Sequence, residues 1–475
     1  MPNLKKLLPR EPLSQLTPYL YLLVHGCFLL ALMITGPEIF YSIEDYFLIP
    51  SFLFLGAAFS RKQSPAAVRK LLLSLSMVIW FLIASQKHDY WGLETRPTWL
   101  LSVYLLAYPF AALTGDGENK RGLRLIAGIF LSAAAVLILY AVLLTLDCLP
   151  EGLEKSVYWD GARLRDMWHP NIGACIFMIG IAFCLGFATE AGKKWQKGLL
   201  IGFAAVLFVA SGITNSRTSI LMTCALVGGF VFFCIFKNNG WKRFLLGAAA
   251  ALMVMVALFL LAGKAYDWNN DRLIAKYTAQ LQAMEEARQD DSGEVSENAP
   301  SQETLEAPPV NVNKETGEIS LQITNGQGSL AGDLRTLNNR TYIWRAALWL
   351  MRENPQFRIW GTGLTKDMVS SYNNFPVGHT HNSWMEVYVS LGIPGLAIAL
   401  IFTLTAGLDA LFLMFHRRTT MQQKVVCLLV ICIMGAGFLE PYLFLSDKSY
   451  HFIDFLFFLC IGYMTQWREA LRKKK

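Results

Sequence analysis

Several histidines and arginines stand beside long apolar stretches of the sequence. His379 and His381 lie in GHTHNSWMEV, directly before an apolar run, and Arg217 lies in TNSRTSI, between two such runs. A neutral imidazole can accept a proton near pH 7, and a guanidinium can bind phosphate oxygens through two parallel hydrogen bonds. The pattern therefore predicts acid–base chemistry beside a phosphate-bearing group.

Three more arginines and a third histidine occupy similar positions. Arg163, Arg165 and His169 precede the apolar run that begins near residue 171, and Arg340 begins the segment RTYIWRAALWLMREN. Snorkelling to lipid headgroups is the alternative for such arginines. His379 lies two residues from His381, so the two would not share a helical face. We take His381 as the candidate base, with helix capping as its alternative role.

Paired carboxylates, the usual ligands of Mg²⁺ and Mn²⁺, are poorly placed for catalysis. The candidates lie in or beside a polar insert, or lack a neighbouring histidine: Glu38, Glu44, Asp45, Glu285, Glu286, Asp290 and Asp291. The nine cysteines fall in or beside apolar runs, where free cysteine behaves as a small hydrophobic residue. We therefore predict no metal and no cofactor.

The apolar runs set the class of protein. Of 475 residues, 54% are hydrophobic and 16% charged, whereas soluble domains carry about 25% charged residues. Many runs approach the roughly 20 residues that cross a bilayer core. This excludes soluble, secreted disulfide-rich and disordered proteins and predicts an all-α polytopic membrane protein. Twelve spans are expected, at about 17–36, 44–59, 71–86, 97–113, 124–147, 171–189, 198–214, 218–236, 244–263, 385–414, 425–445 and 451–466.

The charge of the loops predicts the orientation. Alternate loops such as EAGKKWQK and KNNGWKR, and the tail WREALRKKK, are basic, whereas the short loops between them are neutral or acidic. Basic loops stay in the cytoplasm, so the net charge of +7 orients the chain rather than binding nucleic acid. Both termini are predicted to be cytoplasmic, with a retained first helix. The histidines and arginines above then lie on the extracytoplasmic side.

The predicted domain organisation has three parts. Residues 1–263 hold helices one to nine, residues 264–384 form one large extracytoplasmic loop, and residues 385–475 hold three helices and the basic tail. Within the loop, residues 285–310 are acidic and rich in Ser, Pro and Glu, a composition that predicts disorder.

Two helices are predicted to flank this insert. The first covers about 270–287, and the second runs from Arg340 to Pro355 with apolar residues at helical spacing. The second helix should lie on the membrane surface or pack on the outer ends of the spans.

Four segments, taken in order, resemble the O-antigen ligase/polymerase superfamily. RDMWHPNIGA at 165–174 is similar to its Arg…Pro-Asn element, and SRTS at 216–219 to its Ser-Arg-Ser/Thr turn. Residues 340–364 resemble the element before the family's His helix, and HNSWMEVYVSLGIPG at 381–395 resembles that helix. The matching positions in the last two segments are Arg340, Trp344, Asn354, Pro355, Gly361, Gly363, His381, Asn382, Gly392 and Gly395.

The resemblance implies a GT-C-like fold of about a dozen helices in a bacterial cytoplasmic membrane. It implies transfer of a glycan from an undecaprenyl-diphosphate donor to an acceptor on the extracytoplasmic face. Arg217 and Arg340 would bind the pyrophosphate leaving group, and His381 would activate the acceptor hydroxyl for an inverting, metal-independent displacement. Arg163 or Arg165 would supply a third contact. The acidic insert departs from the family pattern.

Three activities stay open at this point. A ligase hands the glycan to a lipid core, a polymerase of the same superfamily extends another lipid-linked repeat unit, and relatives glycosylate proteins. A lipid-linked glycan flippase is the rival from a different class. A transporter should carry polar groups at mid-membrane, whereas the spans here look nearly bare of charge. The sequence therefore favours a transferase of the ligase type.

Overall fold

The computed structural model describes most of the helical core of the chain. The described residues are 65–86, 121–148, 157–160, 163–166, 170–236, 240–290, 310–312, 319–321, 340–362, 380–444 and 451–473. Some of the residues between 22 and 33 are described as well. The predicted spans near 44–59 and 97–113 lie outside these residues, and so does most of the predicted insert.

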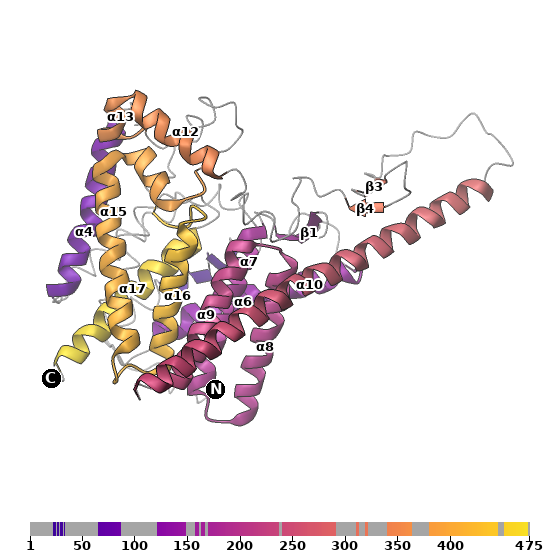
Figure 1. Ribbon diagram of the computed structural model, residues 1–475, viewed down its shortest axis with the longest axis horizontal. Helices are drawn as coiled ribbons and strands as arrows, with labels where there is room; N and C mark the ends of the chain where they lie inside the picture. Colours follow the sequence, from indigo (N-terminus) through magenta and orange to yellow (C-terminus); the bar gives the residue numbers. More distant parts are fainter. Residues whose placement is uncertain are drawn as a thin grey trace, which may run out of the picture.

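The described chain is mostly helical (Figure 1). Seven of its helices are long and apolar enough to cross a membrane, which confirms a polytopic membrane protein. The count of twelve spans and the GT-C-like fold stay predictions. The long helices are α4 (Pro65–Gln86), α6 (Arg121–Thr145), α7 (Pro170–Glu190), α8 (Lys194–Ile213), α9 (Arg217–Phe236), α10 (Trp241–Asp290), α15 (Ser383–Phe415), α16 (Met421–Gly437) and α17 (His451–Lys473).

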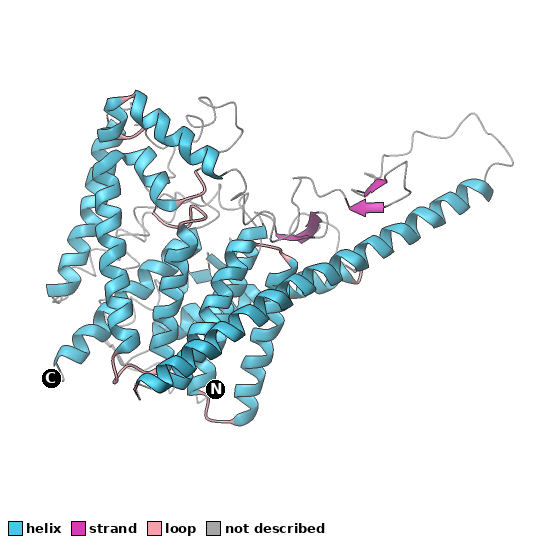
Figure 2. Cartoon of the chain, in the orientation of Figure 1, coloured by secondary structure: helices cyan, strands magenta, loops and turns pink. Residues whose placement is uncertain are grey.

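Two small β-ribbons make the prediction of an all-α protein incomplete (Figure 2). Strands β1 (Val157–Asp160) and β2 (Arg163–Asp166) pair antiparallel directly before α7, and β3 (Val310–Val312) pairs with β4 (Ile319–Leu321). Each strand has only three or four residues, too few for their alternation to stand out from the apolar runs around them.

Helix α7 lies at the centre of the bundle. In its membrane-spanning window 89% of the residues are buried, against 6% for α10. Helices α6, α8, α9 and α16 all pack against α7. Small residues such as Gly180 allow this close approach, since a Cβ there would lie 2.8 Å from a methyl of Leu207.

Helix α10 corrects the predicted break after residue 263. The structure has one continuous helix of 50 residues, where the sequence predicted a span at 244–263 and a separate helix at 270–287. Its last third runs beyond the body of the bundle (Figure 1). The helix also takes in the start of the insert predicted at 285–310. The polarity changes at Lys264, Asp267 and Asp271, but the helix runs on through the single Gly263 and contains no proline.

Helix α16 is shorter than predicted. The span expected at 425–445 ends at Gly437, and the chain from Phe438 to Phe444 is non-helical. Glu440 precedes Pro441, and a residue before proline is disfavoured in the helical conformation. Residues 440–444 are all buried, so this segment carries an ionisable side chain into the protein.

Two short helices cover the N-terminal end of α15, which agrees with the predicted packing of the second flanking helix on the ends of the spans. Helix α12 (Arg340–Glu353) packs Ile343, Ala347 and Met351 against Val389 of α15. Helix α13 (Pro355–Trp360) follows and also packs on α15.

Two glycines fix the contact between α13 and α15. Gly392 has a φ of 68° inside α15, and a Cβ there would lie 2.3 Å from the carbonyl oxygen of Ile359. Gly361 has a φ of 72°, and its Cβ would lie 2.1 Å from the carbonyl oxygen of Ser390. Only glycine allows both the backbone angle and the approach. These residues are two of the four motif glycines.

Buried charges lie towards the ends of α4, α15 and α17. Asp409 of α15 is 4% exposed and pairs with Lys70 of α4 and Arg468 of α17. Asp454 of α17 is fully buried and accepts a hydrogen bond from the backbone N–H of Phe444. All of these charges lie towards the ends of their helices. The expectation that the middle of the spans is nearly bare of charge therefore stays a prediction.

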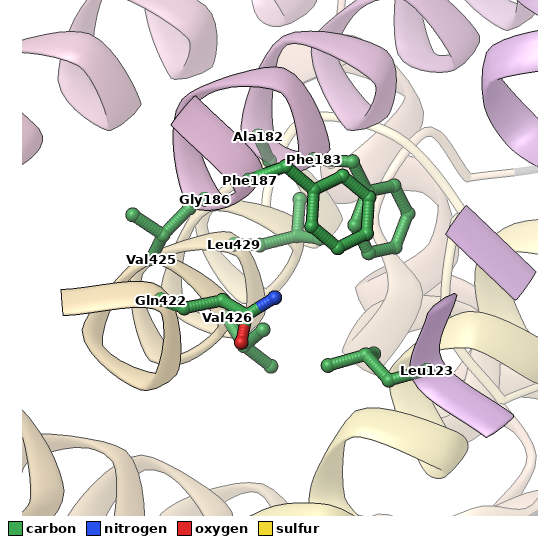
Figure 3. Close-up of a pocket in the computed structure, with 9 residues that line it drawn as sticks. All are labelled: Leu123, Ala182, Phe183, Gly186, Phe187, Gln422, Val425, Val426 and Leu429. Carbon is green, nitrogen blue, oxygen red and sulfur yellow. The ribbon is translucent and has the colours of Figure 1, made fainter. Parts of the chain in front are cut away.

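A small apolar cavity lies between α6, α7 and α16 (Figure 3). Gln422, at the start of α16, is buried at its edge.

Candidate active site

His381 lies in the tight turn that begins α15. Its φ of 52° places a non-glycine residue in the left-handed region, which costs energy and is enriched at functional sites. Asn382 is the helix cap: its side-chain oxygen accepts hydrogen bonds from the backbone N–H groups of Trp384 and Met385. The capping role that the sequence left open for His381 therefore belongs to Asn382.

Helix α12 holds this turn from the outside. The indole N–H of Trp344 donates to the carbonyl oxygen of Thr380 at 2.9 Å. The backbone N–H and the hydroxyl of Thr380 both donate to Glu386 at 2.8 Å. The residues on either side of His381 are thus fixed by side chains of two helices.

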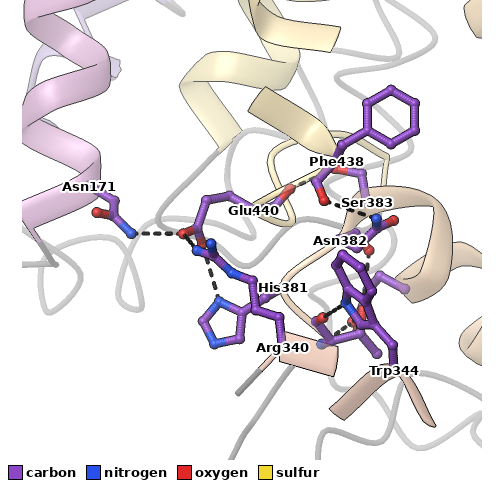
Figure 4. A network of polar contacts seen from close by, with 10 residues as sticks. Asn171, Arg340, Trp344, His381, Asn382, Ser383, Phe438 and Glu440 are labelled. Carbon is purple, nitrogen blue, oxygen red and sulfur yellow. Dashed lines mark hydrogen bonds and ion pairs between the residues drawn. The ribbon is translucent and has the colours of Figure 1, made fainter. Parts of the chain in front are cut away.

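Glu440 is the centre of the site, and its carboxylate bonds to three separate segments (Figure 4). Oε1 accepts from Arg340 at 2.5 Å and from the amide of Asn171 at 3.0 Å. Oε2 lies 3.3 Å from Nδ1 of His381. The carboxylate is 2% exposed, and a buried carboxylate needs such partners to be tolerated.

The backbone of Glu440 is fixed as well. Its carbonyl oxygen accepts from the hydroxyl of Ser383 at 3.0 Å, and that hydroxyl in turn accepts from the N–H of Leu443 at 3.0 Å. The amide of Asn382 donates to the carbonyl oxygen of Phe438 at 3.0 Å. The turn that carries His381 and the segment that carries Glu440 therefore form one unit.

Arg340 reaches this unit from the first residue of α12. Its guanidinium is 14% exposed, and its Nε is buried without a hydrogen-bond partner in the described part of the chain. The side chain of His381 is 30% exposed. Two of the three predicted catalytic residues, Arg340 and His381, thus meet on one carboxylate.

Arg217 lies at the start of α9, directly after the tight turn that the sequence predicted. Helix α8 ends at Ile213 and α9 begins at Arg217. Ser219, two residues on, lies 3.5 Å from Sγ of Cys175 on α7. Cys175 is one turn from Asn171, the residue that bonds to Glu440. The start of α9 therefore lies beside the helix end that contributes to the site, and a catalytic role for Arg217 stays a prediction.

Arg163 and Arg165 lie in β2, which packs against α7 and α8. In the ribbon they stand opposite Asp160 and Tyr158. This places the strand directly before the helix that carries Asn171. Their role as a third anion contact stays a prediction. His169 and His379 lie outside the described residues.

Sequence reasoning missed Glu440 although a signal was present. An ionisable residue inside an apolar run marks a functional site by default, and GFLEPYLF holds one directly before a proline. The span predicted at 425–445 includes this acid. Asn171 belongs to the segment that resembles the family's Arg…Pro-Asn element, and the resemblance implies no role for it.

The described residues contain no group of three or more His, Cys, Asp and Glu side chains that could hold a metal ion. Their polar chemistry is instead that of an anion site: a guanidinium with a buried unpartnered donor beside an imidazole and a carboxylate. Such a donor set suits a phosphate-bearing substrate and a hydroxyl that must lose a proton.

The family model described as O-antigen ligase matches residues 200–400, a segment that contains Arg217, Arg340 and His381 but neither Arg163, Arg165 nor Glu440. No curated protein gives a significant match. The match agrees with the resemblance of the sequence motifs: residues 200–400 of this membrane protein are similar to the O-antigen ligase family.

Proposed function

We propose that the protein is a membrane glycosyltransferase of the O-antigen ligase type. It transfers a glycan from undecaprenyl diphosphate to an acceptor hydroxyl on the extracytoplasmic face of a bacterial cytoplasmic membrane. The observation that carries the proposal is the buried carboxylate of Glu440, which brings Arg340 and His381 together. The match to the superfamily supports the class of reaction.

Arg340 and Arg217 bind the diphosphate in this proposal, with Arg163 or Arg165 as a third contact. Arg340 bonds to Glu440 through one terminal nitrogen, and a guanidinium has five N–H donors. Its remaining terminal N–H groups are the donors proposed to bind the phosphate oxygens. Positive charge at this place stabilises the negative charge that develops on the leaving group.

The transfer step is an in-line displacement at the anomeric carbon. The acceptor oxygen forms the new bond to that carbon, and the bond from the carbon to the phosphate oxygen breaks with its electron pair. The proton of the acceptor hydroxyl passes to His381, and undecaprenyl diphosphate leaves with one more negative charge. The configuration at the anomeric carbon inverts. No metal takes part in this proposal.

Glu440 acts as a positioning residue for His381. When Nδ1 of His381 donates to the carboxylate, Nε2 is the ring nitrogen that accepts a proton. The carboxylate then stabilises the imidazolium that forms, as in other His–carboxylate pairs. Asn171 and Arg340 hold the carboxylate in place from its other oxygen.

Purified protein in detergent, given an undecaprenyl-diphosphate glycan and EDTA, tests this function. The proposal predicts a glycosylated acceptor together with free undecaprenyl diphosphate. Ligase and polymerase differ in the acceptor, so a lipid core and a second lipid-linked repeat unit are both offered. A flippase moves its substrate from one side of a membrane to the other. A detergent solution has no such sides, so a flippase would yield no glycosylated acceptor. Absence of product with every acceptor, despite a folded protein, contradicts the proposal, as does product that disappears on addition of EDTA.

A further inference from the structure

The turn that carries His381 has an unfavourable backbone conformation. His381 has a φ of 52°, and this left-handed conformation costs a non-glycine residue energy and persists only where its neighbours fix it. On the C-terminal side, Asn382 is fixed as the cap of α15. On the N-terminal side lies Thr380, which is 1% exposed. The conformation of His381 therefore depends on how Thr380 is held.

Thr380 is bonded to both of the helices beside it. Its N–H donates to Oε2 of Glu386 at 2.8 Å, and its hydroxyl lies 2.8 Å from the same oxygen. Its carbonyl oxygen accepts from the indole N–H of Trp344 at 2.9 Å. The hydroxyl also lies 3.1 Å from the carbonyl oxygen of Asn382, the second acceptor for its one proton. Glu386 thus holds the backbone N–H of the residue before His381.

Glu386 reaches back over the first turn of α15 to make these bonds. It is the acidic residue of that turn, and it follows Thr380 by six residues. A negative charge at a helix N-terminus is favourable by itself, so the helix dipole is the alternative reason for an acid at this position. The two reasons have different requirements, since the dipole needs a charge and Thr380 needs an acceptor oxygen.

Loss of Glu386 would leave the buried N–H of Thr380 without this acceptor. An unsatisfied buried N–H is unfavourable, so the turn should rotate until this N–H finds another partner. His381 is the next residue, and its Nδ1 lies 3.3 Å from Oε2 of Glu440. Rotation of the turn would therefore move the imidazole away from that carboxylate. A displacement of about 1 Å at a reacting group can cost about 10²-fold in rate.

We infer that Glu386 is a positioning residue for His381: by bonding to Thr380 it fixes the left-handed turn and so holds the imidazole against Glu440. The inference rests on the proposed function, because it assigns a further residue to the same transfer. Glu440 orients the imidazole ring directly, whereas Glu386 acts on the backbone that carries the ring. Glu386 makes no contact with the diphosphate or the acceptor in this account.

Two variants of Glu386 in the detergent transfer assay test the inference. Glu386→Ala removes the acceptor, and we expect kcat to fall by about 10²-fold while KM for the donor stays at the wild-type value. Glu386→Gln loses the charge but keeps an amide oxygen that accepts from Thr380, so we expect it to restore most of kcat. If the helix dipole were the reason for the acid, both variants would lack the charge and would behave alike.

Glu353→Ala is the matched control for these variants. Glu353 is exposed at the end of α12, and its removal is expected to leave kcat and KM at the wild-type values. Thr380→Val removes the hydroxyl but keeps the backbone N–H, so we expect a smaller loss of kcat than in Glu386→Ala. Thermal melting in detergent checks that every variant is folded at the temperature of the assay.

Carbethoxylation of His381 by diethyl pyrocarbonate gives a readout that does not depend on glycan transfer. The reagent modifies the unprotonated imidazole, and mass spectrometry of the peptides gives the rate for each histidine in the absence of substrate. We expect His381 to react about tenfold faster in Glu386→Ala, the effect of one lost buried hydrogen bond on an equilibrium, and at the wild-type rate in Glu386→Gln. His416, at the other end of α15, is the internal reference.

The inference is overturned if Glu386→Ala transfers glycan as fast as Glu353→Ala, or if Glu386→Gln is as slow as Glu386→Ala. Unchanged carbethoxylation of His381 in Glu386→Ala overturns it as well, because the turn has then not moved. Failure of the proposed function is recognised separately. In that case the wild type transfers no glycan to any acceptor, whereas the rates of carbethoxylation still report on the turn.

Discussion

Glu440 bonds to Arg340, His381 and Asn171, which come from three separate parts of the chain. A buried ion pair is costly unless its remaining hydrogen-bonding groups are satisfied. Here each carboxylate oxygen has a partner, while one nitrogen of Arg340 is left without one among the described residues. The arrangement fits a site that is complete only when an anion is bound.

Arg340→Lys tests this arrangement at the level of one residue. Lysine keeps the positive charge but loses the planar fork that binds a phosphate through two hydrogen bonds. We expect kcat/KM for the donor to fall by about 10²-fold, the usual effect of losing a donor that stabilises developing charge. Arg345→Lys, the same change on the exposed side of α12, is the control. Equal activity of the two variants contradicts the role of Arg340.

His381 and Arg340 could be predicted from the sequence because each begins a recognisable helix. Their residue types already indicate acid–base and anion chemistry. Glu440 could not be paired with them, since 59 residues separate it from His381 and nothing in its apolar run predicts the return of the chain after Gly437. Only the fold shows which acid lies beside which base.

At the level of elements, α12 and α13 place Arg340 by packing on the kink of α15. The sequence predicted the helix from Arg340 to Pro355, because its apolar residues repeat at helical spacing, and the structure confirms it. The continuous α10 and the early end of α16 were not predicted. Helix α10 continues through Gly263 and the change of polarity after it, whereas α16 ends although the sequence stays apolar.

Gly392→Ala tests the contact between α13 and α15. The added methyl would require a left-handed conformation and would collide with the carbonyl oxygen of Ile359. We expect a loss of at least about 2 kcal/mol in the free energy of unfolding, the size of such backbone strain, measured by thermal melting in detergent.

Gly202→Ala is the control for this test. A Cβ at this position on α8 meets no atom within 4 Å, and alanine is the better helix former. This variant should melt at or slightly above the wild-type temperature. If Gly392→Ala melts at the same temperature as Gly202→Ala, the glycine is not needed for the contact between α13 and α15.

At the level of the whole molecule, two buried charge clusters lie towards opposite ends of α15. At the start of α15, the hydroxyl of Ser383 donates to the carbonyl oxygen of Glu440. Near the other end of α15, Asp409 forms ion pairs with Lys70 of α4 and Arg468 of α17. Along the helix, Ser383 and Asp409 are roughly 40 Å apart at 1.5 Å per residue. The distance exceeds the thickness of a hydrocarbon core of about 30 Å, so the clusters can lie near the two membrane surfaces.

Cys148 offers a native test of the predicted orientation. It is exposed at the end of α6, beside the ion pair of Asp147 with Lys276, and this end of α6 is predicted to be extracytoplasmic. We expect a membrane-impermeant maleimide to label it on spheroplasts before lysis, with Cys148→Ser as the unlabelled control. Labelling of Cys148 that requires lysis would reverse the orientation of the whole chain.

The central claim is that His381, oriented by Glu440, takes the proton of the acceptor. A double-mutant cycle on the reconstituted transfer reaction in EDTA tests it most directly, with wild type, His381→Ala, Glu440→Gln and the double variant. Residues that act as a unit give non-additive effects. We predict that each single variant loses about 10²-fold or more in kcat, and that the double variant is no slower than His381→Ala. Wild-type turnover in His381→Ala, or strictly additive losses in the double variant, would contradict the account.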